Sequence, residues 1–213
     1  MQDRQFLSGY RYDGSQSNHS HAYLLPRVKA ILDGYFESRD IQREVFDLGC
    51  GNGSAASWLT QHEYSVTGVD PSLDGIAAAN AAFPHLKLMQ GTAYDDLAAR
   101  CGTFPALISL EVIEHVYAPR EFARTAFQLV KDGGIAVFSA PYHGYVKNVA
   151  IAVSGNFDRH VNPLWDHGHI KFWSVATLSK LLADTGFIDL KYYRVGRIGI
   201  LAKSMIAVAR KPS

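Results

Sequence analysis

The sequence predicts an α/β fold built on a mainly parallel sheet. Strand and helix patterns alternate along most of the chain, which is typical of this class. The first strand pattern, EVFDLG at 44–49, is largely apolar, as expected for a strand buried on both faces of a sheet. The last two strand patterns have no helix pattern between them, so we expect them to pair as an antiparallel hairpin.

The individual elements follow from periodicity and from the residues at their ends. Strands are predicted at 44–49, 64–70, 86–91, 105–111, 135–141, 187–195 and 202–210. Helices are predicted at 22–36, 54–63, 72–83, 119–130 and 174–186. Ser72 and Ser174 suit N-caps, and Pro119 suits a first helical turn. Gly133 and Gly134 are expected to end a helix and begin a turn.

Residues 142–172 have no clear periodicity and are rich in His, Tyr, Trp and Asn. A long irregular stretch inside a compact domain is more often a lid or a binding loop than a simple connection. We therefore expect this stretch to be irregular and to lie near a binding site.

Length and composition limit the classes of protein. The 213 residues fit one domain with room for a lid or an insertion. The 21 basic and 20 acidic residues give a net charge of +1 and form no basic stripe, so we expect no nucleic-acid partner. No signal peptide or membrane-spanning run is visible. Two cysteines, Cys50 and Cys101, form no disulfide framework, which predicts a cytoplasmic location.

A glycine-rich loop directly follows the first strand. In VFDLGCGNG, residues 45–53, Gly49, Gly51 and Gly53 occupy every second position. Glycine has no Cβ, so these positions permit unusual backbone angles and the close approach of a ligand. An ordinary strand-to-helix turn needs fewer glycines, and we therefore predict a ligand-binding loop.

An acidic residue, Asp70, ends the second strand beside this loop. Its carboxylate is suited to accept hydrogen bonds from both hydroxyls of a ribose, although a turn before Pro71 would also explain it. NAD-binding proteins share such an acid, but their third glycine falls where this chain has Ser54. S-adenosylmethionine has no phosphate and needs only a loop along which its methionine part can lie.

Five motifs together resemble the class I S-adenosylmethionine-dependent methyltransferases. They are VFDLGCGNG, VTGVDPS, GTAYDDL, ALISLEVIEHV and LVKDGGIAVFSAP, within residues 43–141. The chain is most similar to the ubiquinone-biosynthesis O-methyltransferase type. The resemblance implies a Rossmann-like doubly wound sheet of seven strands with an antiparallel C-terminal hairpin strand. It also implies a single domain, 1–213, with an N-terminal helical lid at 1–40 and a substrate-side insertion at 142–173.

The resemblance also implies roles for residues at the cofactor. Asp47 would lie near the amino group of S-adenosylmethionine, and Leu110 would border its methionine part and reactive methyl group. The family often has an acidic residue at the position of Thr92, so this chain departs from the pattern there. The implied cofactor-binding residues are Asp47, Gly49, Gly51, Gly53, Asp70, Pro71, Thr92, Ala93, Leu110 and Glu111.

The stretch EVIEH raises a separate possibility. Glu111, Glu114 and His115 are spaced i, i+3, i+4, so they would share one face of a helix and would suit a divalent metal ion. The resemblance permits a metal here, but we expect none. The alternative is that Glu111 points at the cofactor while the other two brace the following helix, or that His115 takes a proton from the substrate.

Removal of a proton from an acceptor hydroxyl requires a base, and histidine titrates near neutrality. His143 directly follows the fifth strand and is our first choice, with His115 as the second candidate. His160, His167 and His169 lie in the same irregular stretch. DHGHIKFW at 166–173 permits either a metal cluster or a turn at Gly168.

We therefore expect an S-adenosylmethionine-dependent methyltransferase that acts on a small molecule, most readily at oxygen, and releases S-adenosylhomocysteine. Two alternatives stay open. One is an NAD-linked oxidoreductase, and the other is a non-catalytic cofactor-binding protein. The sequence does not indicate the oligomeric state.

Overall fold

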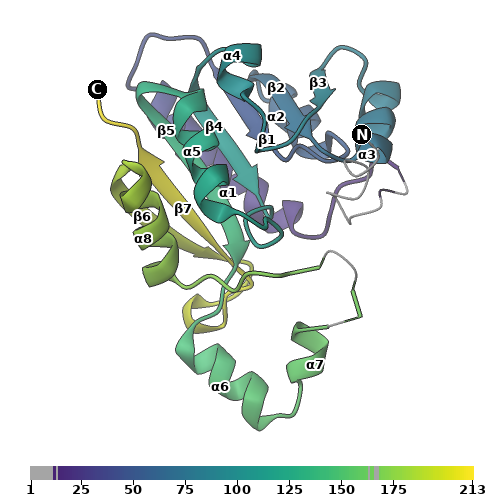
Figure 1. Ribbon diagram of the computed structural model, residues 1–213, viewed down its shortest axis with the longest axis vertical. Helices are drawn as coiled ribbons and strands as arrows, with labels where there is room; N and C mark the ends of the chain where they lie inside the picture. The colour runs from purple at the N-terminus through teal and green to yellow at the C-terminus, as the bar shows by residue number, and fades with distance from the viewer. Residues whose placement is uncertain (1–11, 13, 163, 166–167) are drawn as a thin grey trace.

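The computed structural model describes residues 12, 14–162, 164–165 and 168–213, and they form a seven-stranded sheet with helices on both faces (Figure 1). The strand order is β3-β2-β1-β4-β5-β7-β6. Strands β1 to β5 pair in parallel, whereas β7 pairs antiparallel with both β5 and β6. This confirms the predicted Rossmann-like sheet and its antiparallel C-terminal hairpin.

The bounds of the elements agree with most of the predicted ranges. The strands are β1 Glu44–Leu48, β2 Ser65–Asp70, β3 Lys87–Gln90, β4 Phe104–Leu110, β5 Val130–Pro141, β6 Ile188–Val195 and β7 Ser204–Arg210. The helices are α1 His21–Phe36, α2 Ser54–Thr60, α3 Leu73–Ala82, α4 Leu97–Cys101, α5 Pro119–Leu129, α6 Tyr145–Val153, α7 Phe157–His160 and α8 Val175–Thr185, with a 3₁₀ turn, η2, at Gly199–Leu201.

Alternate residues of the central strands face two different apolar clusters. Phe46 and Phe138 pack with α5 and α8 on one face of the sheet. Val45 and Val137 pack with α1, α2 and α3 on the other face. Successive side chains of a strand point to opposite faces, so a strand buried on both faces must be apolar at almost every position. This explains the largely apolar strand patterns of the sequence.

Two expectations about local structure are wrong. Strand β5 begins at Val130, so KDGG is a bulge in a strand rather than a turn before one. Phe104 pairs with Val130 but Ala106 pairs with Ile135, and the residues between are accommodated by a register shift. The stretch 142–172 is also not irregular throughout, because it contains α6 and α7. Helix α6 buries only Ile151, and its other apolar residues are exposed.

None of the helices that the structure describes is long and apolar enough to cross a membrane.

The start of α8 provides a test of the local structure. Ser174 accepts a hydrogen bond from Thr177 N–H, and the Thr177 hydroxyl accepts one from Ser174 N–H, which forms a capping box. We expect Ser174→Ala to lower the free energy of unfolding by about 1 kcal/mol in urea denaturation. Ser213→Ala, at an exposed site outside the helices, is the control and should change it by less than about 0.5 kcal/mol. Equal effects of the two substitutions would contradict a capping role.

Candidate active site

A cavity of about 1150 Å³ opens at the carboxyl ends of the parallel strands. Its walls include residues that follow β1, β2, β3 and β4, which is where open α/β sheets bind their ligands. Ten of the twelve residues that the sequence predicts for the site lie in this wall: Asp47, Gly49, Gly51, Asp70, Pro71, Thr92, Ala93, Leu110, Glu111 and His115. Gly53 and His143 are not among its wall residues.

The glycine loop requires glycine for both conformation and space. The φ angles of Gly49, Gly51 and Gly53 are +91°, +52° and +75°. A Cβ at Gly49 would lie 2.5 Å from a methyl group of Val112, and one at Gly51 would overlap the phenol of Tyr12. Gly53 is the N-cap of α2 and supports the loop from behind. The loop therefore presents bare backbone to the cavity at Gly49 and Gly51.

Asp70 connects the glycine loop to the turn after β2. Its Oδ2 accepts a hydrogen bond of 2.9 Å from Gly51 N–H, and its Oδ1 accepts one of 2.8 Å from Ser72 N–H. Burial raises the pKa of Asp70 to about 6, while these two bonds act in the opposite direction. Each carboxylate oxygen has two lone pairs, so both oxygens can still accept a hydrogen bond from a ligand hydroxyl.

Asp47 is a buried carboxylate that lacks a full set of partners. Its side chain is 1% exposed, and among the described residues none hydrogen-bonds to its Oδ2. Burial raises the pKa of Asp47 to about 7, with a further contribution from the charge of Asp70. A buried polar atom without a partner is unfavourable, and a cationic group in the cavity would satisfy it.

The loop after β3 forms another part of the wall. Thr92 N–H donates to Asp95 Oδ2 at 2.8 Å, and the Thr92 hydroxyl oxygen accepts from Tyr94 N–H at 3.2 Å. Asp95 thus fixes the loop and is not itself a wall residue. Thr92 and Ala93 present the atoms of this loop to the cavity, beside Pro71.

Glu111 does not share a helical face with Glu114 and His115, because residues 111–116 form a turn. The φ angle of Glu111 is +55°, in the left-handed region. Its carboxylate accepts hydrogen bonds from the hydroxyls of Ser139, at 2.8 Å, and Ser204, at 3.2 Å. Burial raises the pKa of Glu111 to about 7. The side chain is therefore held toward β5 and β7, and Glu111, Glu114 and His115 do not form a triplet.

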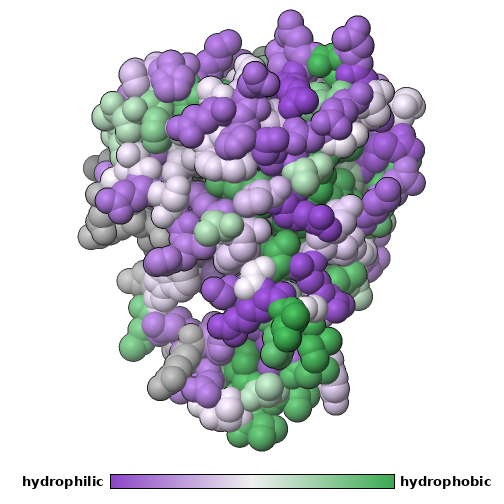
Figure 2. All heavy atoms as spheres, turned by 180° about the vertical axis from the view of Figure 1, so that it is seen from behind, coloured by the Kyte–Doolittle hydropathy of each residue, from purple (hydrophilic) through white to green (hydrophobic). Residues whose placement is uncertain are grey.

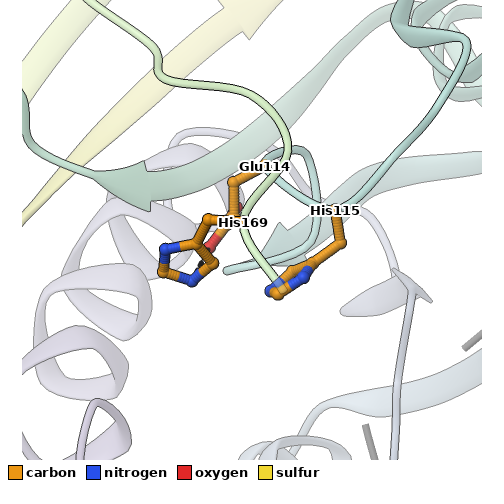
Figure 3. A group of neighbouring side chains, drawn as sticks. All are labelled: Glu114, His115 and His169. Carbon is orange, nitrogen blue, oxygen red and sulfur yellow. Dashed lines mark ion pairs between the residues drawn. The ribbon is translucent and has the colours of Figure 1, made fainter. Parts of the chain in front are cut away.

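A different triplet lies in the cavity wall. Glu114 and His115 meet His169 from the chain segment before α8 (Figure 3). His169 Nε2 lies 3.9 Å from Glu114 Oε1, and the two imidazole rings are 4.9 Å apart. The structure thus joins one residue pair from EVIEH with one histidine from DHGHIKFW. His167 lies outside the described residues.

Backbone hydrogen bonds hold the two segments of this triplet together. The N–H groups of Ile170 and Lys171 both donate to the carbonyl of Glu114, at 2.9 and 3.0 Å. The indole N–H of Trp173 donates to the carbonyl of Ile113 at 3.1 Å. These contacts place His169 in a fixed position against the turn after β4.

Burial favours the uncharged forms of two members of the triplet, Glu114 and His169. The pKa of Glu114 is raised well above its ordinary value, first by burial and then by Glu111. Burial, together with nearby His115 and His143, lowers the pKa of His169 to about 4. The His115 Nδ1 lies 3.1 Å from the carbonyl oxygen of Gly168, which can only accept. This bond puts the ring hydrogen of neutral His115 on Nδ1 and its lone pair on Nε2.

The triplet also has the chemistry of a metal site. Its three ligand atoms lie within 4.8 Å of one another, and two imidazoles with a carboxylate are a common set for Zn²⁺ and other transition-metal ions. Both carboxylate oxygens of Glu114 lack hydrogen-bond partners among the described residues. If a divalent cation bound in this cavity, Glu114, His115 and His169 are the residues that would hold it, and it would polarise an acceptor oxygen.

The N-terminal segment covers one side of the cavity. Asn52, in the glycine loop, donates hydrogen bonds to the carbonyls of Gly14, at 2.7 Å, and Gln16, at 3.0 Å. His21 Nδ1 lies 3.4 Å from the Ser54 hydroxyl oxygen. Asn52 was not among the predicted site residues, although its position between Gly51 and Gly53 would have indicated a role in the loop.

His143, which we expected at the binding site, is not among the residues that line the cavity. It is half-buried, its ring contacts Phe172 edge-on at 5.2 Å, and its Nδ1 is 3.4 Å from Asn148 Oδ1. Trp165 and His169, further along the same stretch, reach the wall instead. A position directly after a strand was insufficient to predict which histidine faces the cavity.

Comparison with known proteins identifies the family. Residues 12–192 match the family described as methyltransferase domain. The chain belongs to this methyltransferase family. It is an S-adenosylmethionine-dependent methyltransferase, as expected, and the alternative of an NAD-linked oxidoreductase is wrong. Asp47 Oδ2, which has no hydrogen-bond partner among the described residues, is suited to the cationic amino group of this cofactor.

Curated relatives of the methyltransferase share moderate identity with it. It is 28% identical over 153 residues to a ubiquinone biosynthesis O-methyltransferase of Vibrio parahaemolyticus, covering 70% of this chain and 65% of that protein. It is 37% identical over 115 residues to a protein of the same name from Caulobacter vibrioides, covering 52% of this chain and 45% of that protein. The matches therefore span less than two thirds of these relatives.

Solved structures with a similar fold are also methyltransferases. A phosphoethanolamine N-methyltransferase 2 of Haemonchus contortus, in complex with S-adenosyl-L-methionine, has a TM-score of 0.66 and 15% identity, over 88% of this chain and 53% of that one. The methyltransferase domain of bacterial CtHen1 has a TM-score of 0.65 and 20% identity, over 87% and 96%. At these identities the likeness supports the fold alone.

The Asp47 carboxylate should lower the stability of the cofactor-free protein and strengthen binding of the cofactor. Between its ordinary pKa of 3.8 and about 7, the folded chain binds a proton that the unfolded chain does not, so the free energy of unfolding falls as pH rises through this range. We expect Asp47→Asn to stabilise the cofactor-free protein by about 1–3 kcal/mol near pH 8.5 and to change little near pH 4. Urea denaturation at both pH values measures this.

The same substitution should weaken binding of S-adenosylhomocysteine by about 1.5–3 kcal/mol in calorimetry, because a hydrogen bond to a charged group is lost. Asp40→Asn, at an exposed position, is the matched control for both measurements. A less stable Asp47→Asn protein at high pH would contradict the assignment of an unpaired buried charge.

Asp70→Ala should weaken binding of S-adenosylhomocysteine by about 1.5–3 kcal/mol, because it removes an acceptor for the ribose hydroxyls. Asp74→Ala, four residues further along and exposed, is the control. Calorimetry on folded protein compares the two. Unchanged affinity in a folded Asp70→Ala variant would remove Asp70 from the site.

Proposed function

We propose that this methyltransferase transfers the methyl group of S-adenosylmethionine to a hydroxyl oxygen of a small molecule. The observation that carries the proposal is the triplet Glu114, His115 and His169, which faces the same cavity as Asp47 and Asp70. An acceptor hydroxyl must lose its proton, and the triplet provides a base for it. The names of the curated relatives also favour oxygen as the acceptor atom.

The cofactor would lie along the glycine loop. We propose that Asp47 accepts hydrogen bonds from the amino group of the cofactor. Asp70 would accept hydrogen bonds from the ribose hydroxyls. Pro71, Thr92 and Ala93 would border the adenine. Leu110 and Glu111 would border the methionine part. Gly53 would act indirectly, because it shapes the loop without lining the cavity. The triplet, which lies in the same cavity wall, would be left to contact the acceptor.

The main requirement for transfer is correct positioning of the acceptor, because the sulfonium methyl group is already activated. When bound, S-adenosylmethionine would supply an activated methyl group, and an acceptor oxygen held in line with it would form an O–CH₃ bond as the S–CH₃ bond breaks. The hydroxyl proton passes to Nε2 of His115, which its Nδ1 bond to Gly168 holds in orientation. We therefore propose His115, rather than His143, as the catalytic base. Neutral His169 and protonated Glu114 would keep the site free of a competing charge.

We also propose that the two flanking segments enclose the substrate. Residues 14–40 of the predicted lid contact the glycine loop through Asn52, and the 142–173 segment supplies Trp165 and His169 to the wall. Free thiols at Cys50 and Cys101 support a cytoplasmic location.

The activity is tested by labelling. Purified protein is incubated with S-adenosylmethionine that carries a radioactive methyl group and with a fractionated extract of small metabolites. We expect label in a product that mass spectrometry and NMR spectroscopy identify as a methyl ether. Label on nitrogen or carbon would contradict the choice of oxygen. A folded protein that binds the cofactor and labels nothing would favour a non-catalytic binding protein.

With that acceptor identified, we expect His115→Ala to lower kcat by about 10²–10⁴-fold and to leave the affinity for S-adenosylhomocysteine unchanged. His85→Ala, at an exposed position away from the cavity wall, is the matched control. Full activity of His115→Ala would exclude His115 as the base.

Dialysis against EDTA should leave kcat unchanged, since the proposal uses His115 as a base and not as a metal ligand. The measurement compares dialysed protein with protein to which Zn²⁺, Mg²⁺ or Mn²⁺ has been returned. Loss of activity that a metal restores would instead assign Glu114, His115 and His169 to a catalytic cation.

A further inference from the structure

A single lysine lies in the cavity wall. Lys203 is the one lysine or arginine among the described residues of this wall, which also contains four carboxylates: Asp47, Asp70, Glu111 and Glu114. Figure 2 shows hydrophilic side chains over much of one face of the molecule, so an exposed lysine is not by itself unusual. A lysine that lines the cavity is different, because its charge can act on whatever the cavity binds.

Lys203 lies across the sheet from the glycine loop. It directly precedes β7, whose first residue, Ser204, pairs with Pro141 at the carboxyl end of β5. Strands β4 and β5 lie between β1 and β7. Neighbouring strands are about 4.8 Å apart, so the ends of β1 and β7 are separated by about 14 Å. Lys203 is therefore far from the proposed place of the cofactor and belongs to the part of the wall left for the acceptor.

Lys203 has no carboxylate partner among the described residues. None of the ion pairs between described residues includes it. Its ammonium lies over the ring of Tyr23, another wall residue, with Nζ 5.4 Å from the ring centroid. Burial raises the pKa of Glu111 to about 7, and the cation that acts against this rise is Lys147. The charge of Lys203 is therefore available to a ligand.

The carboxylates of the wall have other partners in the proposed complex. Asp47 and Asp70 would bind the amino group and the ribose of the cofactor. Glu111 accepts hydrogen bonds from Ser139 and Ser204, which hold it toward the sheet. S-adenosylmethionine also carries a positive sulfonium, so the loaded cavity would attract an anion more strongly than the empty one.

The chain around Lys203 is basic. Residues 194–203 contain three basic residues and no acidic one. The guanidinium of Arg194 lies 4.8 Å from the ring centroid of Tyr142, whose N–H donates to the carbonyl of Lys203 at 2.9 Å. Basic residues around a cavity raise the local concentration of anions and the rate at which they enter. This edge of the cavity therefore favours an anionic acceptor.

We propose that Lys203 binds an anionic oxygen group, a carboxylate or a phosphate, of the methyl acceptor. The ammonium would donate a charge-assisted hydrogen bond to this group, while a hydroxyl of the same molecule reaches His115. The inference deepens the proposed function and rests on it. The hydroxyl proton passes to His115 as the O–CH₃ bond forms and the S–CH₃ bond breaks, so the anionic group keeps its charge in the product.

The first test sorts acceptors by charge. A metabolite extract is separated at pH 7 on a strong anion exchanger, and both fractions are incubated with the full chain and S-adenosylmethionine that carries a radioactive methyl group. We expect labelled product from the retained fraction only, and we expect the exchanger to retain that product again. Treatment of the product with alkaline phosphatase distinguishes the two anions, because a phosphate is removed and a carboxylate stays.

The outcomes separate this inference from the proposed function. Equal or greater labelling of the unretained fraction would overturn the inference and leave methyl transfer to oxygen standing. A labelled product that is no longer retained would be a methyl ester of the anionic group itself, which would also overturn the inference. No label in either fraction would contradict the proposed function and the inference together.

The second test is substitution of the lysine. With the acceptor identified, Lys203→Gln should raise its KM about tenfold and leave kcat within about twofold, because the lost bond holds the acceptor equally before and during transfer. Lys203→Arg keeps the charge and should retain most of the affinity. The side chain is exposed, and the backbone N–H of Lys203 donates to the carbonyl of Val195 whatever the side chain, so both variants should fold.

Lys87→Gln, exposed at the start of β3 and outside the cavity wall, is the matched control and should keep the KM of the unsubstituted chain. Calorimetry with S-adenosylhomocysteine should give the same affinity for every variant. An unchanged KM in folded Lys203→Gln would overturn the inference. Weaker binding of S-adenosylhomocysteine by Lys203→Gln would overturn it as well, since this would assign Lys203 to the carboxylate of the cofactor.

Discussion

The hydrogen bonds of the Asp70 carboxylate fix the geometry on which the cofactor site depends. One oxygen holds Gly51 N–H and the other holds Ser72 N–H, so a single side chain joins the ends of β1 and β2. A loop with glycines at three alternate positions, all with positive φ angles, can adopt many conformations. Charge-assisted bonds from a buried group favour one of them, because they are stronger than bonds between neutral groups.

The buried carboxylates of this cavity differ in whether they have hydrogen-bond donors. Asp70 and Glu111 have hydrogen-bond donors, whereas Asp47 and Glu114 have carboxylate oxygens without a described partner. Unpartnered buried carboxylates lower stability, and proteins keep them where a ligand completes the site. We propose that the cationic amino group of the cofactor reaches Asp47, and Glu114 lies beside two imidazoles. The cavity is thus least stable where it is expected to act.

The segment 142–173 has two separate roles in the structure. Its final part is tied to the turn after β4 by backbone bonds to Glu114 and by the indole of Trp173, which places His169 in the wall. Its first part forms α6, which turns valines outward and a lysine inward. One insertion therefore shapes the cavity and also exposes apolar side chains on α6.

The sequence by itself determined the sheet, the glycine loop and the acid beside it. These features depend on neighbours in the chain: alternate residues of buried strands must be apolar, and Asp70 ends the strand next to Gly49 and Gly51. Only the tertiary structure decided which histidines reach the cavity. His115 and Gly168 are 53 residues apart, and their contact depends on how two loops pack. The outward face of α6 was equally invisible, because a run of valines and alanines has the same sequence whether it faces the core or the solvent.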